Sequence, residues 1–81
     1  MKVKIYTTNP CPYCSMAKNL LKNRKIDFEE IYVSYSDDAK WIELEKETGF
    51  KTMPQIFIND QFIGGYTELA RLDSQGKLTS K

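Results

Sequence analysis

Two prolines on either side of Cys11 fix the point at which the first helix of this chain begins. Pro10 restricts its own φ angle and biases Asn9 toward an extended conformation, so the backbone is stiffened as it approaches Cys11. Pro12 suits the first helical position, because the N–H group that it lacks would have no helical partner there. The sequence therefore predicts Cys11 at or near the N-cap of a helix.

The helix that begins at Pro12 is predicted to extend to about Arg24 and to separate two strands. Its apolar side chains recur at helical spacing, at Met16, Ala17, Leu20 and Leu21. The segments 3–6 and 28–33 are rich in β-branched and aromatic residues, which is typical of strands. A strand, a helix and a strand at this spacing indicate a right-handed parallel crossover.

A second helix is predicted over residues 37–47. Ser36 or Asp37 suits its N-cap, and acidic residues are favoured in its first turn by the helix dipole. The apolar residues of this helix form a thin stripe, which comprises Ala39, Trp41, Ile42 and Leu44. We expect this stripe to lie against the sheet and the charged remainder of the helix to face solvent.

A β-hairpin and a last helix complete the prediction. Residues 55–58 and 61–64 are short apolar runs around Asn59-Asp60, which favours a hairpin turn. The last helix is expected from Tyr66 to near Gly76.

The predicted order of elements is β-α-β-α-β-β-α. This order indicates an α/β fold in which a four-stranded mixed sheet carries helices on both faces. Residues 77–81 are polar for the most part and are expected to form a frayed tail.

Length and composition limit what this fold can do. With 81 residues the chain is expected to form one domain, residues 1–81, and 41% hydrophobic residues are enough for a thin core. Twelve Lys and Arg against eleven Asp and Glu leave a net charge of +1. So small a charge provides no broad positive field, and nucleic acid is not expected as a partner.

The compartment is predicted from what the sequence lacks. No stretch approaches the roughly 20 apolar residues of a membrane span, and Met1 leads into a strand pattern without the apolar region of a signal peptide. We therefore expect a cytoplasmic protein without membrane contact. A purely structural disulfide is not expected to persist in a reducing cytoplasm, so a cysteine pair there needs a catalytic or metal-binding role.

Cys11 and Cys14 are predicted to form a redox-active dithiol. They are the only cysteines, and thiols three residues apart on a helical turn can form a disulfide. Cys11 lies where helix N–H groups converge, which favours its thiolate and lowers its pKa into the range of roughly 3.5 to 7.5. Cys11 is therefore the predicted nucleophile, and the more shielded Cys14 is the resolving thiol.

Two other interpretations of the cysteine pair exist. A closed zinc site needs four ligands, and this chain has two cysteines and no histidine, so two carboxylates would be required. Inert buried cysteines are the second alternative. A helix start with a cysteine at each end of one turn argues against them.

Two further segments have features of a binding site. A cis Met53-Pro54 bond would make the main chain of Met53 available to an extended peptide, whereas an ordinary trans bond would mark only a strand entry. Gly64-Gly65 before a helix start allows close approach of an anion, although such a pair is commonly just a turn. Lys51 could add a cation for a carboxylate or could be solvated surface.

Taken together, these segments resemble the glutaredoxin family, of the short dithiol type with a thioredoxin fold. The resemblance covers nearly the full length of the chain. It is carried by Lys4-Ile5-Tyr6-Thr7, Cys11-Pro12-Tyr13-Cys14, Thr52-Met53-Pro54-Gln55-Ile56-Phe57-Ile58 and Gly64-Gly65-Tyr66-Thr67-Glu68-Leu69. The family implies a cis Met53-Pro54 bond and a thiol–disulfide oxidoreductase that uses glutathione as reducing co-substrate, with no tightly bound cofactor and no metal.

The resemblance also implies how glutathione would bind. The tripeptide would lie along the main chain of Met53, with its sulfur toward Cys11. Its γ-glutamyl carboxylate would meet the start of the last helix, and its glycyl carboxylate would approach a lysine and a tyrosine. The implied glutathione-binding residues are Tyr13, Lys51, Thr52, Met53, Pro54, Gly65, Tyr66, Thr67 and Glu68.

The chain departs from the family at three positions. Thr8 stands where the family usually carries a lysine, three residues before the first cysteine. Met53 replaces the commoner valine, and Pro10 is not the usual neighbour of the nucleophile. We expect a monomer whose partners are glutathione and disulfide-bearing or glutathionylated proteins, with ribonucleotide reductase as a plausible client by family resemblance.

Three alternative functions remain at this point. A thioredoxin-like electron donor would be recharged by a flavoprotein reductase instead of glutathione. A binding module would hold an iron–sulfur cluster with glutathione between two subunits, although Pro12 stiffens the loop and by resemblance argues against cluster assembly. A non-catalytic adaptor would carry an incidental disulfide, with a Cys11 pKa near the free value of about 8.5.

Overall fold

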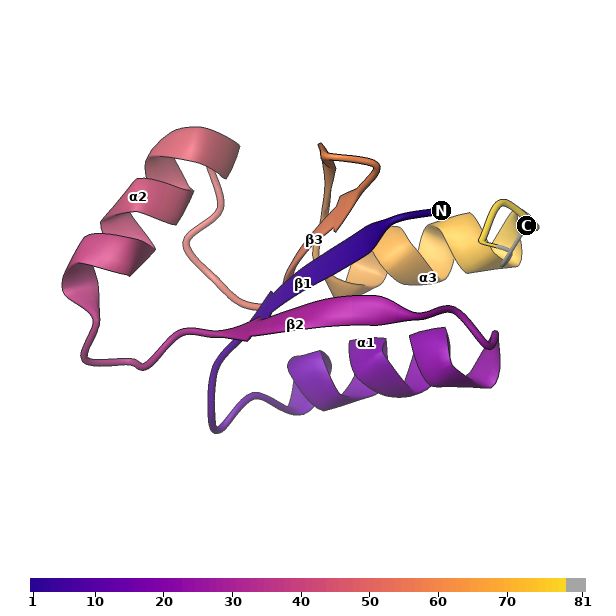
Figure 1. The fold of residues 1–81 in the computed structure, drawn as a ribbon, viewed down its shortest axis with the longest axis horizontal. Coiled ribbons are helices and arrows are strands. Elements are labelled where there is room, and N and C mark those ends of the chain that lie inside the picture. Colours follow the sequence, from indigo (N-terminus) through magenta and orange to yellow (C-terminus); the bar gives the residue numbers. More distant parts are fainter. Residues whose placement is uncertain (79–81) are drawn as a thin grey trace.

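A computed structural model describes residues 1–78 of the chain. The elements follow the predicted order, β-α-β-α-β-β-α (Figure 1). Their bounds are β1 Val3–Thr7, α1 Pro12–Asn23, β2 Phe28–Tyr32, α2 Asp38–Thr48, β3 Gln55–Ile58, β4 Gln61–Gly64 and α3 Tyr66–Ser74. The predicted fold class is therefore confirmed, with shifts of a residue or so at the ends of some elements.

The four strands form one mixed sheet in the order β2-β1-β3-β4. β1 is parallel to β2 and antiparallel to β3, so the first crossover is of the predicted parallel kind. β3 and β4 form the predicted hairpin. Asn59 and Asp60 have φ angles of 51° and 67° at its turn, in the left-handed region that a two-residue hairpin of the I′ type requires.

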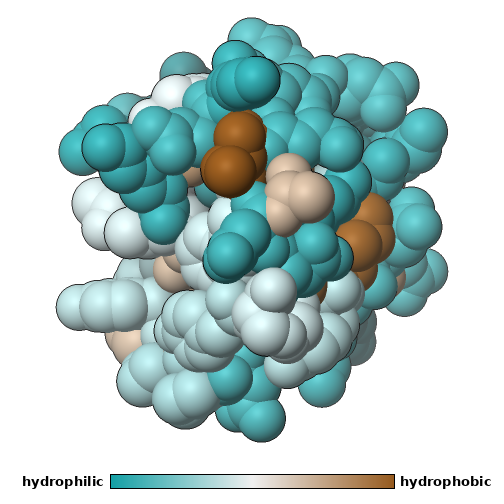
Figure 2. Space-filling view, turned by 90° about the vertical axis from the view of Figure 1, so that its left-hand side faces the viewer, coloured by the Kyte–Doolittle hydropathy of each residue, from teal (hydrophilic) through white to brown (hydrophobic). Residues whose placement is uncertain are grey.

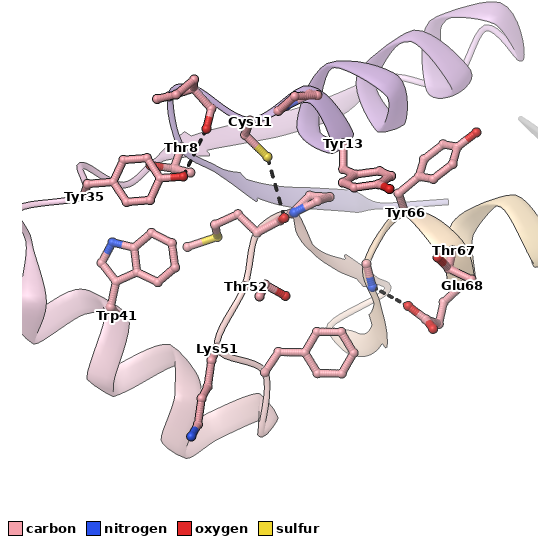
Figure 3. A pocket seen from close by; sticks show the side chains of 16 residues that line it. Thr8, Cys11, Tyr13, Tyr35, Trp41, Lys51, Thr52, Tyr66, Thr67 and Glu68 are labelled. Atoms are coloured by element: carbon pink, nitrogen blue, oxygen red, sulfur yellow. Dashed lines mark hydrogen bonds between the residues drawn. The ribbon is translucent and has the colours of Figure 1, made fainter.

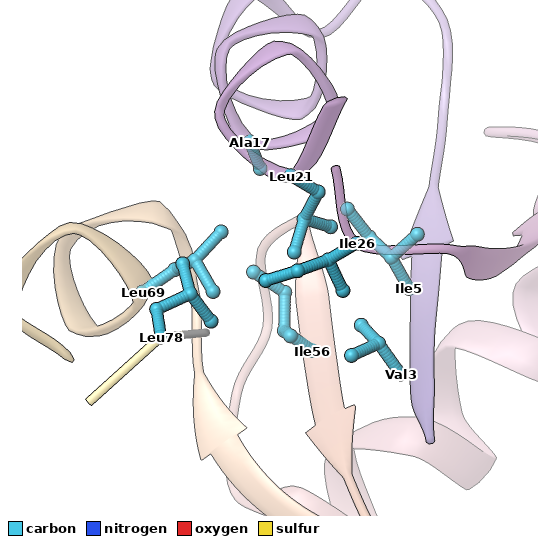
Figure 4. Close-up of a cluster of buried hydrophobic side chains, with 8 residues drawn as sticks. All are labelled: Val3, Ile5, Ala17, Leu21, Ile26, Ile56, Leu69 and Leu78. Carbon is cyan, nitrogen blue, oxygen red and sulfur yellow. The ribbon is translucent and has the colours of Figure 1, made fainter. Parts of the chain in front are cut away.

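The main core lies between one face of the sheet and the helices α1 and α3 (Figures 1 and 4). Alternate residues of β1 point into it, because side chains of a strand alternate between its two faces. Val3, Ile5 and Thr7 are buried, whereas Lys4 and Tyr6 on the opposite face are only partly covered. The buried residues of this core are Val3, Ile5, Ala17, Leu21, Ile26, Ile56, Leu69 and Leu78.

α2 lies near the end of the sheet at which β1 and β2 finish (Figure 1). Asp37 caps it by accepting a hydrogen bond of 3.2 Å from the Lys40 N–H, as predicted. The predicted apolar stripe is only partly correct. Leu44 is buried and Trp41 is half-buried, but Ala39 is exposed and Ile42 is 53% exposed. The helix is rotated so that positions 41, 44 and 48 face inward, which turns 39 and 42 toward solvent.

A second, smaller cluster lies beneath the cysteine pair. Its buried members are Cys14, Val33, Leu44 and Met53. Tyr6, Cys11 and Trp41 pack against it from the partly exposed side. This cluster connects α2 to the start of α1, so it fixes the surroundings of the two cysteines.

An ion pair joins α3 to the residue that follows α1. The Arg24 Nε donates to the Asp73 Oδ1 at 2.6 Å, and the Arg24 Nη2 donates to the Asp73 Oδ2 at 3.0 Å. The hydrogen bond and charge of Arg24 hold the pKa of the Asp73 carboxyl below its usual range. Any stability from this pair is therefore present at neutral pH and is lost as the pH falls through the lowered pKa. None of the described helices is long and apolar enough to cross a bilayer.

The expected frayed tail is wrong for the first two of its residues. The Lys77 N–H donates to the Leu72 carbonyl at 2.9 Å, and the Leu78 side chain is only 3% exposed (Figure 4). Gly76 turns the chain with a φ of 71°, and this returns Leu78 to the core beside Leu69. Residues 79–81 lie outside the described part of the chain.

The burial of Leu78 predicts a measurable contribution to stability. We expect Leu78→Ala to lower the free energy of unfolding by about 2 to 5 kcal/mol, because it leaves a cavity in the main core. Urea unfolding followed by circular dichroism measures this change. Lys77→Ala is the control, since the Lys77 side chain is exposed and its backbone bond is retained. Equal stability of the two variants would show that the tail does not pack.

Candidate redox site

Cys11 and Cys14 are joined by a disulfide at the start of α1, with their Cα atoms 5.2 Å apart. Cys11 has an extended backbone and is the N-cap residue, and Pro12 is the first residue of the helix, as predicted. The Cys14 N–H donates to the Cys11 Sγ at 3.1 Å. The sulfur of Cys11 thus occupies the place at which a capping oxygen normally accepts the free N–H groups of a helix.

The two sulfur-bearing residues differ in exposure. Cys14 is 2% exposed and belongs to the small cluster with Leu44 and Met53, whereas Cys11 is partly exposed. A substrate disulfide can therefore reach Cys11 but not Cys14. This asymmetry is what a nucleophilic and a resolving thiol require.

The main chain of Met53 lies directly beside Cys11. The Met53 carbonyl oxygen is 3.6 Å from the Cys11 Sγ (Figure 3). In the disulfide this sulfur has no proton, so the pair is in simple contact, and a reduced thiol could donate there. The Met53-Pro54 bond is cis, as the resemblance implied, and the Asn9-Pro10 bond is also cis, which the sequence did not predict.

The segment that carries Met53 is held from behind by Gln55. This side chain is 1% exposed, and its Nε2 donates to the carbonyl oxygens of Phe50 at 3.0 Å and Thr52 at 3.3 Å. Its Oε1 lies 2.9 Å from the Thr48 hydroxyl. Sequence reasoning treated Gln55 only as a strand residue. The available signal was a polar side chain at the start of an otherwise apolar, buried strand.

Of the two glycines before α3, Gly65 allows the backbone to approach Pro54 and Gly64 leaves room for the Glu68 side chain. Gly64 has a φ of 122°, and a Cβ on it would collide with the Glu68 side chain. A Cβ on Gly65 would lie 3.2 Å from the Pro54 carbonyl oxygen. Close packing at both positions therefore depends on glycine.

The carboxylate of Glu68 already caps the start of α3. Its Oε1 accepts the Gly65 N–H at 2.7 Å (Figure 3). The N–H groups of Tyr66 and Thr67 lie in the first turn, where a helix offers them no carbonyl partner. An anion that binds here would meet these two N–H groups with Glu68 alongside.

These segments enclose one cavity of about 620 Å³. It has the size typical of small-molecule sites. Cys11 and all nine predicted glutathione-binding residues line it, whereas Cys14 lies behind. The residues that line it are Thr8, Pro10, Cys11, Pro12, Tyr13, Tyr35, Trp41, Phe50, Lys51, Thr52, Met53, Pro54, Gly65, Tyr66, Thr67 and Glu68.

Lys51 reaches this cavity less directly than the sequence suggested. Its Nζ lies 3.8 Å from a carboxylate oxygen of Glu45 on α2, and its side chain is 78% exposed. Figure 3 shows the amine turned away from Cys11. A bound carboxylate would therefore have to draw the lysine from Glu45.

Sequence reasoning missed Tyr35 and Trp41 as lining residues. Their rings stack with centroids 5.6 Å apart and an angle of 11° between their planes. Tyr35 precedes the N-cap of α2 and Trp41 lies in the first turns of the helix, in the manner of a hydrophobic staple. That spacing was the signal that could have paired them.

Thr8 lies in the cavity wall at the position where the family usually has lysine. It is 7% exposed, and within the described residues its hydroxyl has no hydrogen-bond partner. Its neighbour Thr7 is also buried, but the Thr7 hydroxyl donates to Glu30 at 2.8 Å. This bond and the Lys18 ammonium hold the pKa of Glu30 below its usual range.

Comparison with known proteins gives a consistent result. The family model described as Glutaredoxin matches residues 3–63. Glutaredoxin 3 of Escherichia coli is 45% identical over 76 residues, covering 94% of this chain and 90% of its own. A glutaredoxin of Pseudomonas aeruginosa is 42% identical over 76 residues, which cover 94% of this chain and 89% of the relative.

Solved structures agree with these relatives. A buckwheat glutaredoxin–glutathione complex has a TM-score of 0.86 and 28% identity, covering 94% of this chain and 71% of its own. Glutaredoxin 1 of Francisella tularensis, in complex with cacodylate, has a TM-score of 0.81 and 40% identity, covering 91% and 93%.

The thioredoxin-like fold and the paired cysteines define a thiol–disulfide oxidoreductase. Within that class the chain belongs to the glutaredoxin family, as the sequence motifs predicted.

The contrast between Thr7 and Thr8 predicts opposite effects of one substitution. Thr8→Val should raise the free energy of unfolding by about 1 kcal/mol, because it removes a buried hydroxyl without a partner. Thr7→Val should lower it by about 1 kcal/mol or more, because the bond to Glu30 is lost. Urea unfolding measures both variants. A Thr8→Val protein as destabilised as Thr7→Val would contradict this account.

Proposed function

We propose that the chain is a glutathione-dependent oxidoreductase that reduces protein disulfides and glutathione mixed disulfides through Cys11 and Cys14. The observation that carries the proposal is the Cys11 Sγ at the N-cap of α1, hydrogen-bonded by the Cys14 N–H and facing the cavity. Donors at this position stabilise negative charge on sulfur. The thiolate is the species that attacks a disulfide.

A protein disulfide would be reduced in two exchanges. The Cys11 thiolate attacks one sulfur of the client, forms a mixed disulfide with it, and expels the other sulfur as a thiolate that takes up a proton. The Cys14 thiol then loses its proton and attacks the Cys11 Sγ. This releases the second client thiol and leaves the Cys11–Cys14 disulfide, the state that the structure shows.

Two glutathione molecules would restore the dithiol. The first attacks the exposed Cys11 Sγ, which frees Cys14 and leaves glutathione bound to Cys11. The second attacks the sulfur of that glutathione, releasing glutathione disulfide and the Cys11 thiolate. For a glutathionylated client, Cys11 alone suffices, because it takes the glutathionyl group and expels the client thiol.

Glutathione would occupy the part of the cavity that contains Thr52, Met53 and Pro54 on one side and the start of α3 on the other. Its γ-glutamyl carboxylate would accept from the N–H groups of Tyr66 and Thr67, beside Gly65 and Glu68. Its glycyl carboxylate would approach Tyr13 and draw Lys51 from Glu45. The glutathione complex of the structurally similar buckwheat glutaredoxin supports this proposal.

We further propose that the chain acts as one monomeric domain in the cytoplasm, where glutathione keeps it reduced. Its clients would be disulfide-bearing or glutathionylated proteins, among them ribonucleotide reductase by family resemblance. No tightly bound cofactor is needed for this chemistry.

The proposal assigns different roles to the two cysteines, and substitution separates them. Cys11→Ser should abolish reduction of both a protein disulfide and a glutathionylated peptide, because the nucleophile is lost. Cys14→Ser should retain reduction of the glutathionylated peptide and lose most of the reduction of the protein disulfide. Consumption of NADPH through glutathione and glutathione reductase measures both.

The same assay tests the source of electrons. Wild-type protein recharged by thioredoxin reductase but not by glutathione would contradict the proposal, as would turnover by Cys11→Ser. Lys77→Ala, at an exposed position that does not line the cavity, is the control and should keep both activities.

A further inference from the structure

The stacked rings of Tyr35 and Trp41 form a second wall of the cavity. Figure 3 shows them on one side of Cys11, with Tyr13 and Tyr66 on the other. Both pairs of rings line the same cavity. The glutathione site proposed above uses Tyr13 and Lys51 but neither Tyr35 nor Trp41, so the wall formed by these two rings, here called the aromatic shelf, has no role in it.

The polar groups of the aromatic shelf are already engaged. The Tyr35 hydroxyl donates to the Pro10 carbonyl oxygen at 3.0 Å, and the Trp41 Nε1–H donates to the Ser34 carbonyl oxygen at 2.9 Å. These bonds fix both rings without help from a ligand. The shelf therefore presents a preorganised aromatic surface that offers no free polar hydrogen.

The charges around the cavity disfavour a cationic occupant. Among the residues that line it, only Lys51 and Glu68 carry charge. Glu68 lies on the far side of Cys11, whereas Lys51 lies on the side of Trp41 (Figure 3). Lys40, next to Trp41 in sequence, pairs with Glu43 at 3.0 Å. A neutral aromatic ring fits this shelf better than lysine or arginine.

The aromatic shelf is suited to one side chain and not to a broad interface. Tyr35 is 56% exposed, whereas Trp41 is half-buried against the small cluster. The face of the molecule at this end is hydrophilic or of intermediate hydropathy over most of its area, with a few separate hydrophobic areas (Figure 2). Tyr35 is bonded to Pro10, the residue before the partly exposed Cys11, and both rings share the cavity with Cys11. An occupant of the shelf would therefore be a near neighbour of the cysteine that Cys11 attacks.

We propose that Tyr35 and Trp41 form a subsite for an aromatic side chain next to the reactive cysteine of a client disulfide. The subsite makes the protein prefer disulfide peptides that carry such a side chain. This inference rests on the proposed function in that Cys11 is the attacking sulfur. It adds a client-side specificity element opposite the glutathione half of the cavity.

The test compares disulfide peptides that differ at one position. Four peptides place phenylalanine one or two residues before or after the reactive cysteine, and a fifth has alanine there. Pre-reduced protein is mixed with each peptide in a single turnover without glutathione. We expect at least one phenylalanine peptide to react about three to ten times faster than the alanine peptide. Equal rates for all five would overturn the proposal.

Variants assign the preference to the two rings. Trp41→Leu and Tyr35→Leu keep apolar bulk but remove the rings. Each should lower the ratio of the phenylalanine-peptide rate to the alanine-peptide rate toward one. Tyr35→Phe is the matched control, because it keeps the ring stacked on Trp41 and removes only the bond to Pro10, so most of the preference should persist. Retention of the full preference in both leucine variants would contradict the assignment.

Fluorescence provides a readout that does not depend on the stability of the variants. Trp41 is the only tryptophan of the chain. Cys14→Ser protein is trapped as a mixed disulfide with the preferred phenylalanine peptide or with the alanine peptide. Trp41 emission should differ between the two adducts, and identical spectra would overturn the proposal. The wild-type assay with glutathione is scored separately, so failure of glutathione dependence is distinguishable from failure of the subsite.

Discussion

The hydrogen bond from the Cys14 N–H to the Cys11 Sγ is the interaction on which the chemistry of this protein depends. It makes a sulfur the capping group of a helix whose first residue is proline. The same short segment thus begins the helix and supplies donors that would stabilise negative charge on the Cys11 sulfur, the nucleophile of the proposed function. The three-residue spacing also places Cys14 inside the fold, within reach of Cys11 but out of reach of a client.

The rest of the fold positions partners around that sulfur. The main core between the sheet and α1 fixes the helix, and the small cluster with Leu44 supports the disulfide from below. Gln55 holds the segment that carries Met53, and Gly65 allows α3 to begin close to it. The stacked rings of Tyr35 and Trp41 line the cavity on the side of Cys11 opposite Tyr13 and Tyr66 (Figure 3). The cavity is therefore a meeting point of segments that are distant in sequence.

Features that depend on local rules could be predicted from the sequence. The helix start at Pro12 and the Asn59-Asp60 turn follow from short-range conformational preferences, and the structure confirms both. Nine cavity-lining positions were predicted through family motifs, whereas Tyr35 and Trp41 were not. Features that depend on packing were missed: the inward face of α2, the burial of Leu78 and the attraction of Lys51 to Glu45. Each depends on a neighbour that the local sequence does not reveal.

The central claim, that the helix start stabilises the Cys11 thiolate, is tested most directly by the pH dependence of alkylation. Reduced wild-type protein is treated with iodoacetamide over a range of pH, and modification of Cys11 is followed by mass spectrometry, with the urea-unfolded chain as reference. Our account predicts that the rate in the folded protein rises through a pKa well below the free value of about 8.5. A folded-state pKa equal to or above that of the unfolded chain would contradict it.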